Sequence, residues 1–390
     1  MTVLLVSSNS SGSGGGEIYL VYLALGLKEC GHTVVVLTSR AAYMDSVCSA
    51  LMTAGIRVVR ETLLGLAARP LRVIGALSDW GQISRLRRMY RGIGPDIVHV
   101  NQQYDEDGLD YILAAKLSGL PVVGTIHLPM CSNKHLRPLG RIRTIAMRRW
   151  YAACRYRRIF VSTAAMNEFV ALYGGAELGK AIANGVRLRG ASAGEVAGLP
   201  QGWTRGDPVV GFFGRLDTQK DPLLLANAWL VTREQLPNCR LVFVGDGPLR
   251  GDLETWARRV GAEDSVHITG WLSDPSSWWA LVDVFAMTSV FEGMSLALLE
   301  AIHHGKRIVV TECGGVKQVA AKAPWMRVVA DRRPSVVASS LEAVIAEGPP
   351  DEADTRGARE YFSTSRMAEE TLDVYVKARE DGRSGRRNLV

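Results

Sequence analysis

Short apolar segments alternate along the chain with longer segments in which apolar positions recur every three or four residues. The first kind is typical of buried parallel strands, and the second is typical of helices that pack on them. The predicted strands of the first half are residues 2–7, 33–39, 56–61, 96–101, 121–127 and 158–163. The predicted strands of the second half are residues 208–214, 239–247, 265–271, 282–289 and 307–312.

The segments between these strands have the length and period of helices. They include residues 17–31, 222–235, 249–261, 275–282 and 295–305. Alternation of strand and helix over a whole chain predicts doubly wound parallel sheets, and the restart of the pattern predicts two of them.

A segment rich in Gly, Ala and Pro, residues 187–208, interrupts the pattern and marks the predicted boundary between two domains. We expect residues 1–190 to form the first domain and residues 205–360 the second. Ligands of such sheets bind beyond the carboxyl ends of the strands. Two sheets that face a central cleft would therefore serve an enzyme with two substrates.

Composition supports this reading and excludes several classes of protein. The 390 residues are 47% hydrophobic and 22% charged, which describes a globular chain, and no apolar run reaches the length of a membrane span. The N-terminus has no basic leader, so we expect no signal peptide. The six cysteines are scattered, which predicts free thiols in a reducing cytoplasm and argues against a metal cluster.

The net charge of +7 is carried by the first half of the chain, where arginines cluster at residues 85–91 and 141–158. Two interpretations stay open. The clusters are exposed faces of amphipathic helices, or they meet an anionic partner such as a phosphate or a membrane surface. Nucleic acid is not expected, because no motif of a nucleic-acid-binding protein accompanies the charge.

Three glycine-containing turns follow predicted strands and could bring backbone close to a phosphate: one at Gly15 and Gly16, one at Gly214 and one at Gly245. Gly15 and Gly16 follow the first strand and precede a helix, although their spacing fits neither a dinucleotide fingerprint nor a P-loop. Gly214 is followed by Arg215 and Lys220, two cations that can embrace a diphosphate. Each feature also has a simpler explanation when it is considered alone. A tight turn can require glycine for steric reasons, and Arg215 and Lys220 can be solvated surface cations.

The segment SVFEGMSLALLEAIHHG, residues 289–305, places one acid before a predicted helix and another inside it. The amides of Met294, Ser295 and Leu296 would hold an anion at the helix N-terminus. Glu292 would then face the group attached to that anion, and Glu300 could bind vicinal hydroxyls. The alternative is helix capping by Glu292 and a solvated face for Glu300.

Taken in order, GRLDTQKD, VGDGP, TGW and FEGMSLALLEA resemble the retaining GT-B glycosyltransferases of family 4, also called glycosyl transferases group 1. The resemblance extends to the glycine-rich start, to PDIVHVN and PVVGTIH, and to the ending YFSTSRMAEETLDVYVKA. It implies a GT-B fold, with two Rossmann-like domains and a C-terminal helix at about residues 361–380 that crosses back to the first domain. The first domain would bind the acceptor and the second the nucleotide-sugar donor.

The resemblance also implies a set of site residues. The catalytic candidates are His127, Arg215, Lys220 and Glu292. The donor-binding candidates are Gly15, Gly16, Gly214, Arg215, Lys220, Gly245, Gly270, Trp271, Glu292, Gly293, Met294, Ser295, Leu296 and Glu300. Arg215 and Lys220 would contact the diphosphate, Glu292 the sugar hydroxyls, and Glu300 the ribose. Gly270 and Trp271 would flank the base, and His127 would lie close to the reacting sugar.

We expect transfer of a hexose-type sugar from a nucleotide diphosphate sugar, with UDP favoured, and with retention of configuration. No metal or other cofactor is expected, because no D-x-D pair is placed to bridge a diphosphate; the acids of 105–107 are interpreted as partners of a helix dipole. The alternatives are a nucleotide-sugar epimerase or hydrolase of the same fold, and a non-catalytic nucleotide-sugar-binding protein. A nicotinamide oxidoreductase does not fit the glycine spacing.

The acceptor is left open between a small molecule, such as an aminocyclitol or other natural product, and a glycan or lipid-linked acceptor. The basic first domain is compatible with peripheral contact with a membrane surface. A cytoplasmic location is expected.

Overall fold

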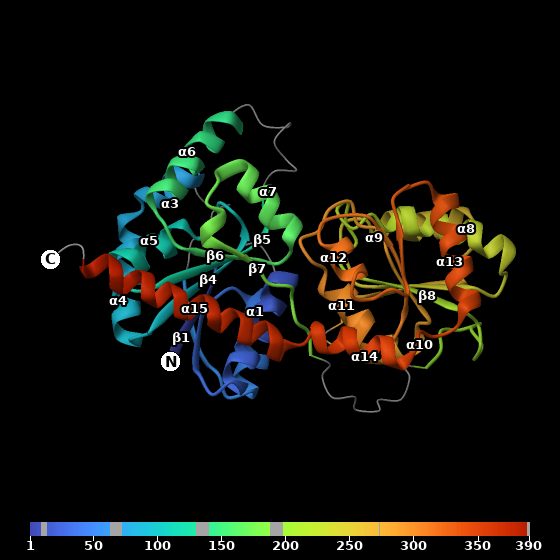
Figure 1. The fold of residues 1–390 in the computed structure, drawn as a ribbon. Helices are drawn as coiled ribbons and strands as arrows, with labels where there is room; N and C mark the ends of the chain where they lie inside the picture. The colour runs from blue at the N-terminus through green and yellow to red at the C-terminus, as the bar shows by residue number, and fades with distance from the viewer. Residues whose placement is uncertain (9–13, 63–71, 130–139, 188–197, 273, 388–390) are drawn as a thin grey trace. The chain divides into compact units, whose positions relative to one another are not determined.

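The computed structural model describes residues 1–8, 14–62, 72–129, 140–187, 198–272 and 274–387. These residues form two compact units, and each unit is described by itself (Figure 1). The first unit comprises Met1–Gly185 and Phe362–Val390, and the second comprises Val186–Tyr361. In the described part of the chain, no helix combines the length and apolar character that a membrane span requires.

The first unit is built on a seven-stranded parallel sheet in the order β3-β2-β1-β4-β5-β6-β7. Its strands are β1 (Thr2–Ser7), β2 (Thr33–Ser39), β3 (Arg57–Glu61), β4 (Ile97–Tyr104), β5 (Val122–Leu128), β6 (Arg157–Phe160) and β7 (Gly179–Ala181). Its helices are α1 (Gly15–Glu29), α2 (Asp45–Thr53), α3 (Arg72–Ser78), α4 (Trp80–Ile93), α5 (Leu109–Leu117), α6 (Gly140–Ala153), α7 (Thr163–Tyr173) and α15 (Thr364–Arg387), with short 3-10 turns η1 (Ala42–Met44) and η4 (Ala176–Leu178).

The second unit is built on a six-stranded parallel sheet in the order β10-β9-β8-β11-β12-β13. Its strands are β8 (Val209–Phe213), β9 (Arg240–Val244), β10 (Val266–Gly270), β11 (Val284–Met287), β12 (Arg307–Thr311) and β13 (Met326–Val329). Its helices are α8 (Pro222–Gln235), α9 (Arg250–Arg259), α10 (Ser276–Leu281), α11 (Leu296–His303), α12 (Val316–Ala320), α13 (Pro334–Glu347) and α14 (Glu352–Tyr361).

Both sheets therefore have the doubly wound order, and the predicted fold class is confirmed. In each sheet the strand order reverses between the first and the fourth strand, which are β1 and β4 in the first unit and β8 and β11 in the second. A crevice opens at such a point, because the helices that follow the two strands turn to opposite faces of the sheet. The strands at these reversals are apolar and buried on both faces, as in β1, where five of six residues are buried.

Local signals in the sequence set the ends of several helices. The carboxylate of Glu17 accepts a hydrogen bond from the Gly14 amide at 2.8 Å, which caps the start of α1. At the other end of α1, Gly31 adopts φ +79°, the left-handed conformation that commonly follows a helix. The helix itself ends at Glu29, two residues before the predicted Gly31, and its C-cap is Cys30.

The last helix, α15, packs on α1 within the first unit (Figure 1). A methyl group at Gly26 of α1 would lie 2.8 Å from the Thr364 backbone oxygen and 2.9 Å from the Ala368 side chain. Glycine in the middle of a helix costs about 1 kcal/mol relative to alanine. Here it allows the two helices to approach each other.

The described part of the predicted linker, residues 198–208, does not lie free between the units. Trp203 is buried and its Nε1 donates to the Asp264 backbone oxygen at 3.0 Å, while Asp207 forms an ion pair with Arg240 at 2.9 Å. These contacts anchor the segment on the second unit, which begins at Val186 instead of residue 205. Residues 188–197 lie outside the described residues.

Candidate functional site

The loops after β8 and β11 meet at the carboxyl edge of the second sheet, where the strand order reverses. β8 ends at Phe213 and leads into the loop that carries Gly214, Arg215 and Lys220. β11 ends at Met287 and leads into the loop that carries Glu292. Because β8 and β11 are hydrogen-bonded neighbours, residues far apart in the sequence come together here.

Lys220 and Glu292 form an ion pair between the Lys220 Nζ and the Glu292 Oε1. Their side chains are 20% and 9% exposed, so little solvent screens the attraction. The Ser289 hydroxyl donates a second hydrogen bond to the same Glu292 oxygen at 2.9 Å. Two of the predicted catalytic residues are thus in direct contact.

Arg215 lies in the same loop but extends into solvent, with 69% of its side chain exposed. Its Nε donates to the Asp217 Oδ2 at 2.6 Å, while the Asp217 Oδ1 accepts from the Lys220 amide at 3.0 Å. Asp217 therefore links the two predicted phosphate-binding cations. The sequence could have indicated this role, because Asp217 lies between Arg215 and Lys220 in GRLDTQKD.

Gly245, which follows β9, is required by the close approach of two turns. A methyl group there would lie 2.0 Å from the Gly214 backbone oxygen, and Gly245 also has φ +148°. The turn is held in place because the Gly214 amide donates to the Val244 carbonyl at 3.0 Å.

Gly270 ends the neighbouring strand β10, and the next residue, Trp271, is 63% exposed at the same edge. A large apolar side chain left in solvent here is available to a flat ligand.

The helix expected from Ser295 begins as α11 at Leu296, and its N-cap is Ser295. The Ser295 hydroxyl accepts a hydrogen bond from the Leu298 amide at 3.4 Å. The alternative interpretation of Glu292 as the helix cap is therefore wrong, since that carboxylate pairs with Lys220 instead. Glu300 lies half-buried on α11, one turn beyond the N-cap.

Gly293 and Met294 connect the ion pair to the helix and are held by the loop after β12. The Gly315 amide donates to the Gly293 carbonyl at 3.0 Å. Gly314 has φ +45°, and a methyl group there would lie 1.7 Å from the Glu292 backbone oxygen. The position of Glu292 thus depends on a loop that the sequence analysis did not single out.

Arg332 and Asp221 are two further residues that the sequence analysis missed. Asp221 follows Lys220 directly, has φ +46° and caps α8 by accepting from the Leu224 amide at 3.3 Å. The Arg332 Nη2 forms an ion pair with the Asp221 Oδ2 at 2.6 Å. Arg332 also donates to the backbone oxygens of Thr288 and Ser289, both at 2.9 Å. One guanidinium therefore joins the Lys220 loop to the Glu292 loop. Arg332 lies in the segment after β13, and the sequence patterns did not predict that strand.

In the first unit, Gly16 and His127 are joined through Asn101. The Asn101 Nδ2 donates to the Gly16 carbonyl at 2.9 Å, and the Asn101 Oδ1 lies 2.8 Å from the His127 Nε2. Gly16 follows β1, Asn101 lies in β4 and His127 in β5, so the group occupies the strand-order reversal of this sheet. The sequence predicted Gly16 and His127 and missed Asn101.

A second buried polar group adjoins His127. The Tyr19 ring packs edge-on against the His127 ring with centroids 4.8 Å apart, and its hydroxyl lies 3.1 Å from the Thr125 Oγ1. His99 joins this group through Thr125 at 2.7 Å and through the Tyr375 hydroxyl of α15 at 2.6 Å. Burial lowers the pKa of His127 to about 4 and that of His99 to about 3, so both rings are neutral at neutral pH.

Gly15 and Gly16 differ in what surrounds them. A methyl group at Gly15 would meet no other atom within 4 Å, whereas one at Gly16 would lie 2.8 Å from the Gln103 Oε1. A methyl group at Gly16 would thus displace only the end of the Gln103 side chain, so contacts within the protein do not by themselves require glycine at either position. Residues 9–13 of the same loop lie outside the described residues.

The acids at 105–107 lie directly before α5, whose N-cap is Gly108 and whose first residue is Leu109. Glu106 forms an ion pair with Arg143 of α6, and Asp107 accepts from the Tyr104 amide at 2.9 Å. Among the described residues, no three His, Cys, Asp or Glu side chains gather in a way that could hold a metal ion.

The arginines of α4 at 85 and 88, and those of α6 at 148 and 149, are exposed. The same helices bury apolar residues such as Leu86 and Met147. These four arginines therefore lie on the exposed faces of amphipathic helices. Contact of these faces with a membrane surface stays a prediction.

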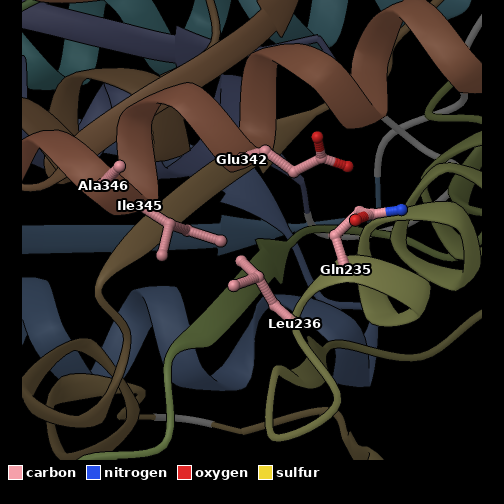
Figure 2. A pocket seen from close by; sticks show the side chains of 5 residues that line it. All are labelled: Gln235, Leu236, Glu342, Ile345 and Ala346. Carbon is pink, nitrogen blue, oxygen red and sulfur yellow. The ribbon is translucent and has the colours of Figure 1, made fainter.

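A hollow lies between α8 and α13 of the second unit, lined by Gln235, Leu236, Glu342, Ile345 and Ala346 (Figure 2). Gln235 ends α8, and β9 begins at Arg240 shortly afterwards. The hollow therefore lies toward the edge where the strands begin, opposite the edge that carries Lys220 and Glu292. No predicted site residue lines it.

Comparison with known proteins assigns both halves of the chain. Residues 13–189 match the model of Glycosyltransferase Family 4, and residues 207–347 match the model of Glycosyl transferases group 1; together they span more than half of the chain.

The relatives of this chain include two bacterial enzymes with named substrates. The 2-deoxystreptamine glucosyltransferase of Streptomyces kanamyceticus is 26% identical over 89% of this chain and 94% of its own. The UDP-Gal:alpha-D-GlcNAc-diphosphoundecaprenol alpha-1,3-galactosyltransferase of Escherichia coli is 28% identical over 63% of this chain and 65% of its own length.

The fold is also that of known structures. Alr3699/HepE of Anabaena, solved in complex with UDP and glucose, matches with a TM-score of 0.76 at 20% identity, over 97% of this chain and all of that one. Two doubly wound units with this likeness make the fold GT-B. The protein is therefore a GT-B glycosyltransferase and belongs to glycosyltransferase family 4, the glycosyl transferases of group 1.

Proposed function

We propose that the protein is a retaining, metal-independent hexosyltransferase that uses a nucleotide diphosphate sugar, with UDP as the favoured nucleotide. The observation that carries the proposal is the pairing of Lys220 with Glu292 where the strand order of the second sheet reverses. A cation and a carboxylate at one crevice suit a donor whose diphosphate is anionic and whose sugar offers hydroxyls. The complex of Alr3699/HepE with UDP and glucose supports the choice of nucleotide and sugar.

The donor residues have distinct roles in this proposal. Lys220 and Arg215 bind the diphosphate, and Glu292 accepts hydrogen bonds from sugar hydroxyls. The amide-bearing turn at Gly293–Leu296 adds the positive end of α11 to the same diphosphate. Glu300 binds the ribose, and Trp271 with Gly270 flanks the base. Gly214 and Gly245 leave room for the nucleotide to approach the backbone.

In the reaction, the bond from the anomeric carbon to the diphosphate oxygen breaks. The bond from that carbon to the acceptor oxygen forms on the same face of the sugar. The acceptor proton passes to the departing phosphate oxygen, so no strong side-chain base is required. Arg215, Lys220 and the helix N-terminus stabilise the charge that develops on the leaving group.

The first unit binds the acceptor. In this proposal Gly15 and Gly16 lie near the diphosphate and leave room for the acceptor, and His127 lies close to the reacting sugar. We favour a small hydroxyl-bearing acceptor of the aminocyclitol class, because the 2-deoxystreptamine glucosyltransferase matches over nearly the full length of both chains. A lipid-linked glycan is the second candidate, supported by the E. coli diphosphoundecaprenol enzyme. We propose a cytoplasmic location for either reaction.

A thermal-shift panel of UDP-, GDP- and ADP-sugars tests the donor, and acceptor screening follows with the donor that binds. The screen compares 2-deoxystreptamine with an undecaprenyl-diphosphate-linked N-acetylglucosamine. Magnetic resonance of the product's anomeric proton tests retention, and a chelator is expected to leave the rate unchanged. An inverted product or a chelator-sensitive rate would overturn the mechanism.

Substitution of the two cations tests the site itself. Arg215→Ala and Lys220→Ala should each lower the rate of transfer by about 10²- to 10³-fold while the fold is retained. Arg333→Ala is the matched control, since Arg333 is an exposed arginine whose Nε donates to Asp331 at 2.7 Å, two residues away, as Arg215 does to Asp217. Near-normal rates in the site variants would exclude this crevice as the donor site.

A further inference from the structure

The amide of Asn101 can be oriented in only one way. Its Nδ2 lies 2.9 Å from the backbone oxygen of Gly16, and a carbonyl oxygen can only accept a hydrogen bond. The group facing Gly16 must therefore be the NH₂ of the amide. The Asn101 Oδ1 then faces the other way, toward His127.

This orientation decides which nitrogen of His127 carries the hydrogen. The Asn101 Oδ1 lies 2.8 Å from the His127 Nε2, and an amide oxygen can only accept. The Nε2 must therefore be protonated and donate. In a neutral imidazole the other nitrogen, Nδ1, then has a free lone pair and can only accept a hydrogen bond.

The surroundings keep the ring neutral and in place. His127 is 7% exposed, and the edge-on Tyr19 ring packs against it at 4.8 Å. Burial also lowers the pKa of His127 to about 4, so the doubly protonated form is rare at neutral pH. The ring is therefore uncharged: its Nε2 donates to Asn101, and its Nδ1 can only accept a hydrogen bond.

Asn101 occupies the right place for such a function. Its position in β4 pairs in register with Ser7 at the end of β1, where the strand order of the first sheet reverses. Side chains that orient a functional histidine through its second nitrogen are a recurrent feature of sites in proteins. Here the same amide also holds the backbone of Gly16 at the start of α1.

We propose that Asn101 is a positioning residue that holds His127 as the Nε2–H tautomer, so that Nδ1 accepts a hydrogen bond from a substrate hydroxyl. The hydroxyl belongs to the donor hexose or to the acceptor. This use of Nδ1 rests on the proposed function, whereas the tautomer itself does not.

Nitrogen magnetic resonance of the full chain labelled at its seven histidines tests the tautomer directly. The His127 resonances are identified by their loss in His127→Gln. We expect a protonated Nε2 and an unprotonated Nδ1 in the unchanged protein, and a mixture of tautomers in Asn101→Leu. A protonated Nδ1 in the unchanged protein would overturn the proposal, as would an unaltered tautomer in Asn101→Leu.

Kinetics test the positioning role. Asn101→Leu should lower kcat/KM by about 10- to 100-fold, by analogy with the loss seen when a partner that orients a metal-binding histidine is removed. A matching rise in KM for the donor assigns the hydroxyl to the sugar, and a rise in KM for the acceptor assigns it there. Unchanged kinetics would overturn the role even if the tautomer changed.

Asn227→Leu is the matched control. Asn227 in α8 also uses both ends of its amide, which donates to the Leu223 carbonyl at 2.9 Å and accepts from the Trp256 Nε1 at 3.1 Å. Its substitution should leave the His127 resonances and the kinetics unchanged. If the unchanged protein transfers no sugar at all, the proposed function fails, while the resonance experiment still decides the tautomer.

Discussion

Lys220 and Glu292 lie 72 positions apart in the sequence and form an ion pair in which both side chains are largely buried. Each charge is compensated by the other in the protein without substrate. A diphosphate that binds Lys220 would release part of the Glu292 carboxylate to accept hydrogen bonds from a sugar. The ion pair is therefore suited to keep the Lys220 and Glu292 side chains in fixed positions until a bound donor replaces one of its interactions.

The first prediction concerns the strength of this pair. Lys220→Met leaves a buried carboxylate without its cation, and we expect the free energy of unfolding of the second unit to fall by about 3 kcal/mol. Lys220→Met combined with Glu292→Gln should be less destabilising than the sum of the single changes. Denaturant unfolding of the four proteins measures the coupling.

The exposed pair Lys317–Glu312 is the control for that cycle, because its side chains are 74% and 40% exposed. Its coupling should be below about 1 kcal/mol. Equal coupling in both pairs would show that burial does not strengthen the Lys220–Glu292 interaction.

The second prediction concerns the link between the two site loops. Arg332→Met removes the ion pair with Asp221 and the hydrogen bonds to the Thr288 and Ser289 carbonyls. We expect kcat/KM for the donor to fall by about 10-fold or more, because small displacements of positioning groups reduce rates strongly. Asp221→Asn should have a smaller effect, since asparagine also tolerates a positive φ and caps a helix.

Steady-state kinetics measure both effects. Arg333→Met serves as the control, because Arg333 pairs only locally with Asp331 at an exposed position. An equal loss of activity in the Arg332 and Arg333 variants would contradict a specific role for Arg332.

The third prediction uses two glycines of the second unit. Gly245→Ala places a methyl group 2.0 Å from the Gly214 backbone oxygen, so the turns must move apart. We expect weaker donor binding, as a smaller thermal shift with the nucleotide sugar, together with reduced stability. Gly251→Ala in α9 meets nothing within 4 Å and should be neutral or slightly stabilising. Equal donor binding by the Gly245→Ala and Gly251→Ala variants would contradict this prediction.

The fourth prediction concerns acid. In the folded first unit the pKa values of His99 and His127 are lowered by burial to about 3 and about 4. In the unfolded chain both titrate near 6.5. The unfolded state therefore binds more protons between about pH 4 and pH 6.5, and the stability of this unit falls as the pH falls through that window.

Hydrogen exchange of β4 and β5 at about pH 7.5 and about pH 5 measures this effect, after correction for the intrinsic rates. His99→Gln should show a smaller loss on acidification, because glutamine does not titrate and can still bond to Thr125 or Tyr375. An unchanged loss in this variant would show that other groups cause the acid sensitivity.

Much of the fold could be predicted because parallel strands buried on both faces are continuous apolar runs. Segments such as residues 2–7 and 33–39 coincide with β1 and β2. The strands missed were short and less apolar: β7 is Gly179–Ala181, and β13 includes the exposed Arg327. Their assignment depends on pairing with β6 and β12, which local patterns do not reveal.

The sequence by itself determined the doubly wound fold and the residues at the carboxyl ends of the strands, because both follow from local periodicity and glycine turns. It also carried the resemblance to a family whose membership the comparisons confirmed. Only the tertiary structure decided which of these residues meet. It paired Glu292 with Lys220 instead of using it as a helix cap, and it brought Arg332 and Asn101 into contact with the candidate sites. These contacts join segments far apart in the chain, and their geometry is set by strand order and packing, which no local pattern encodes.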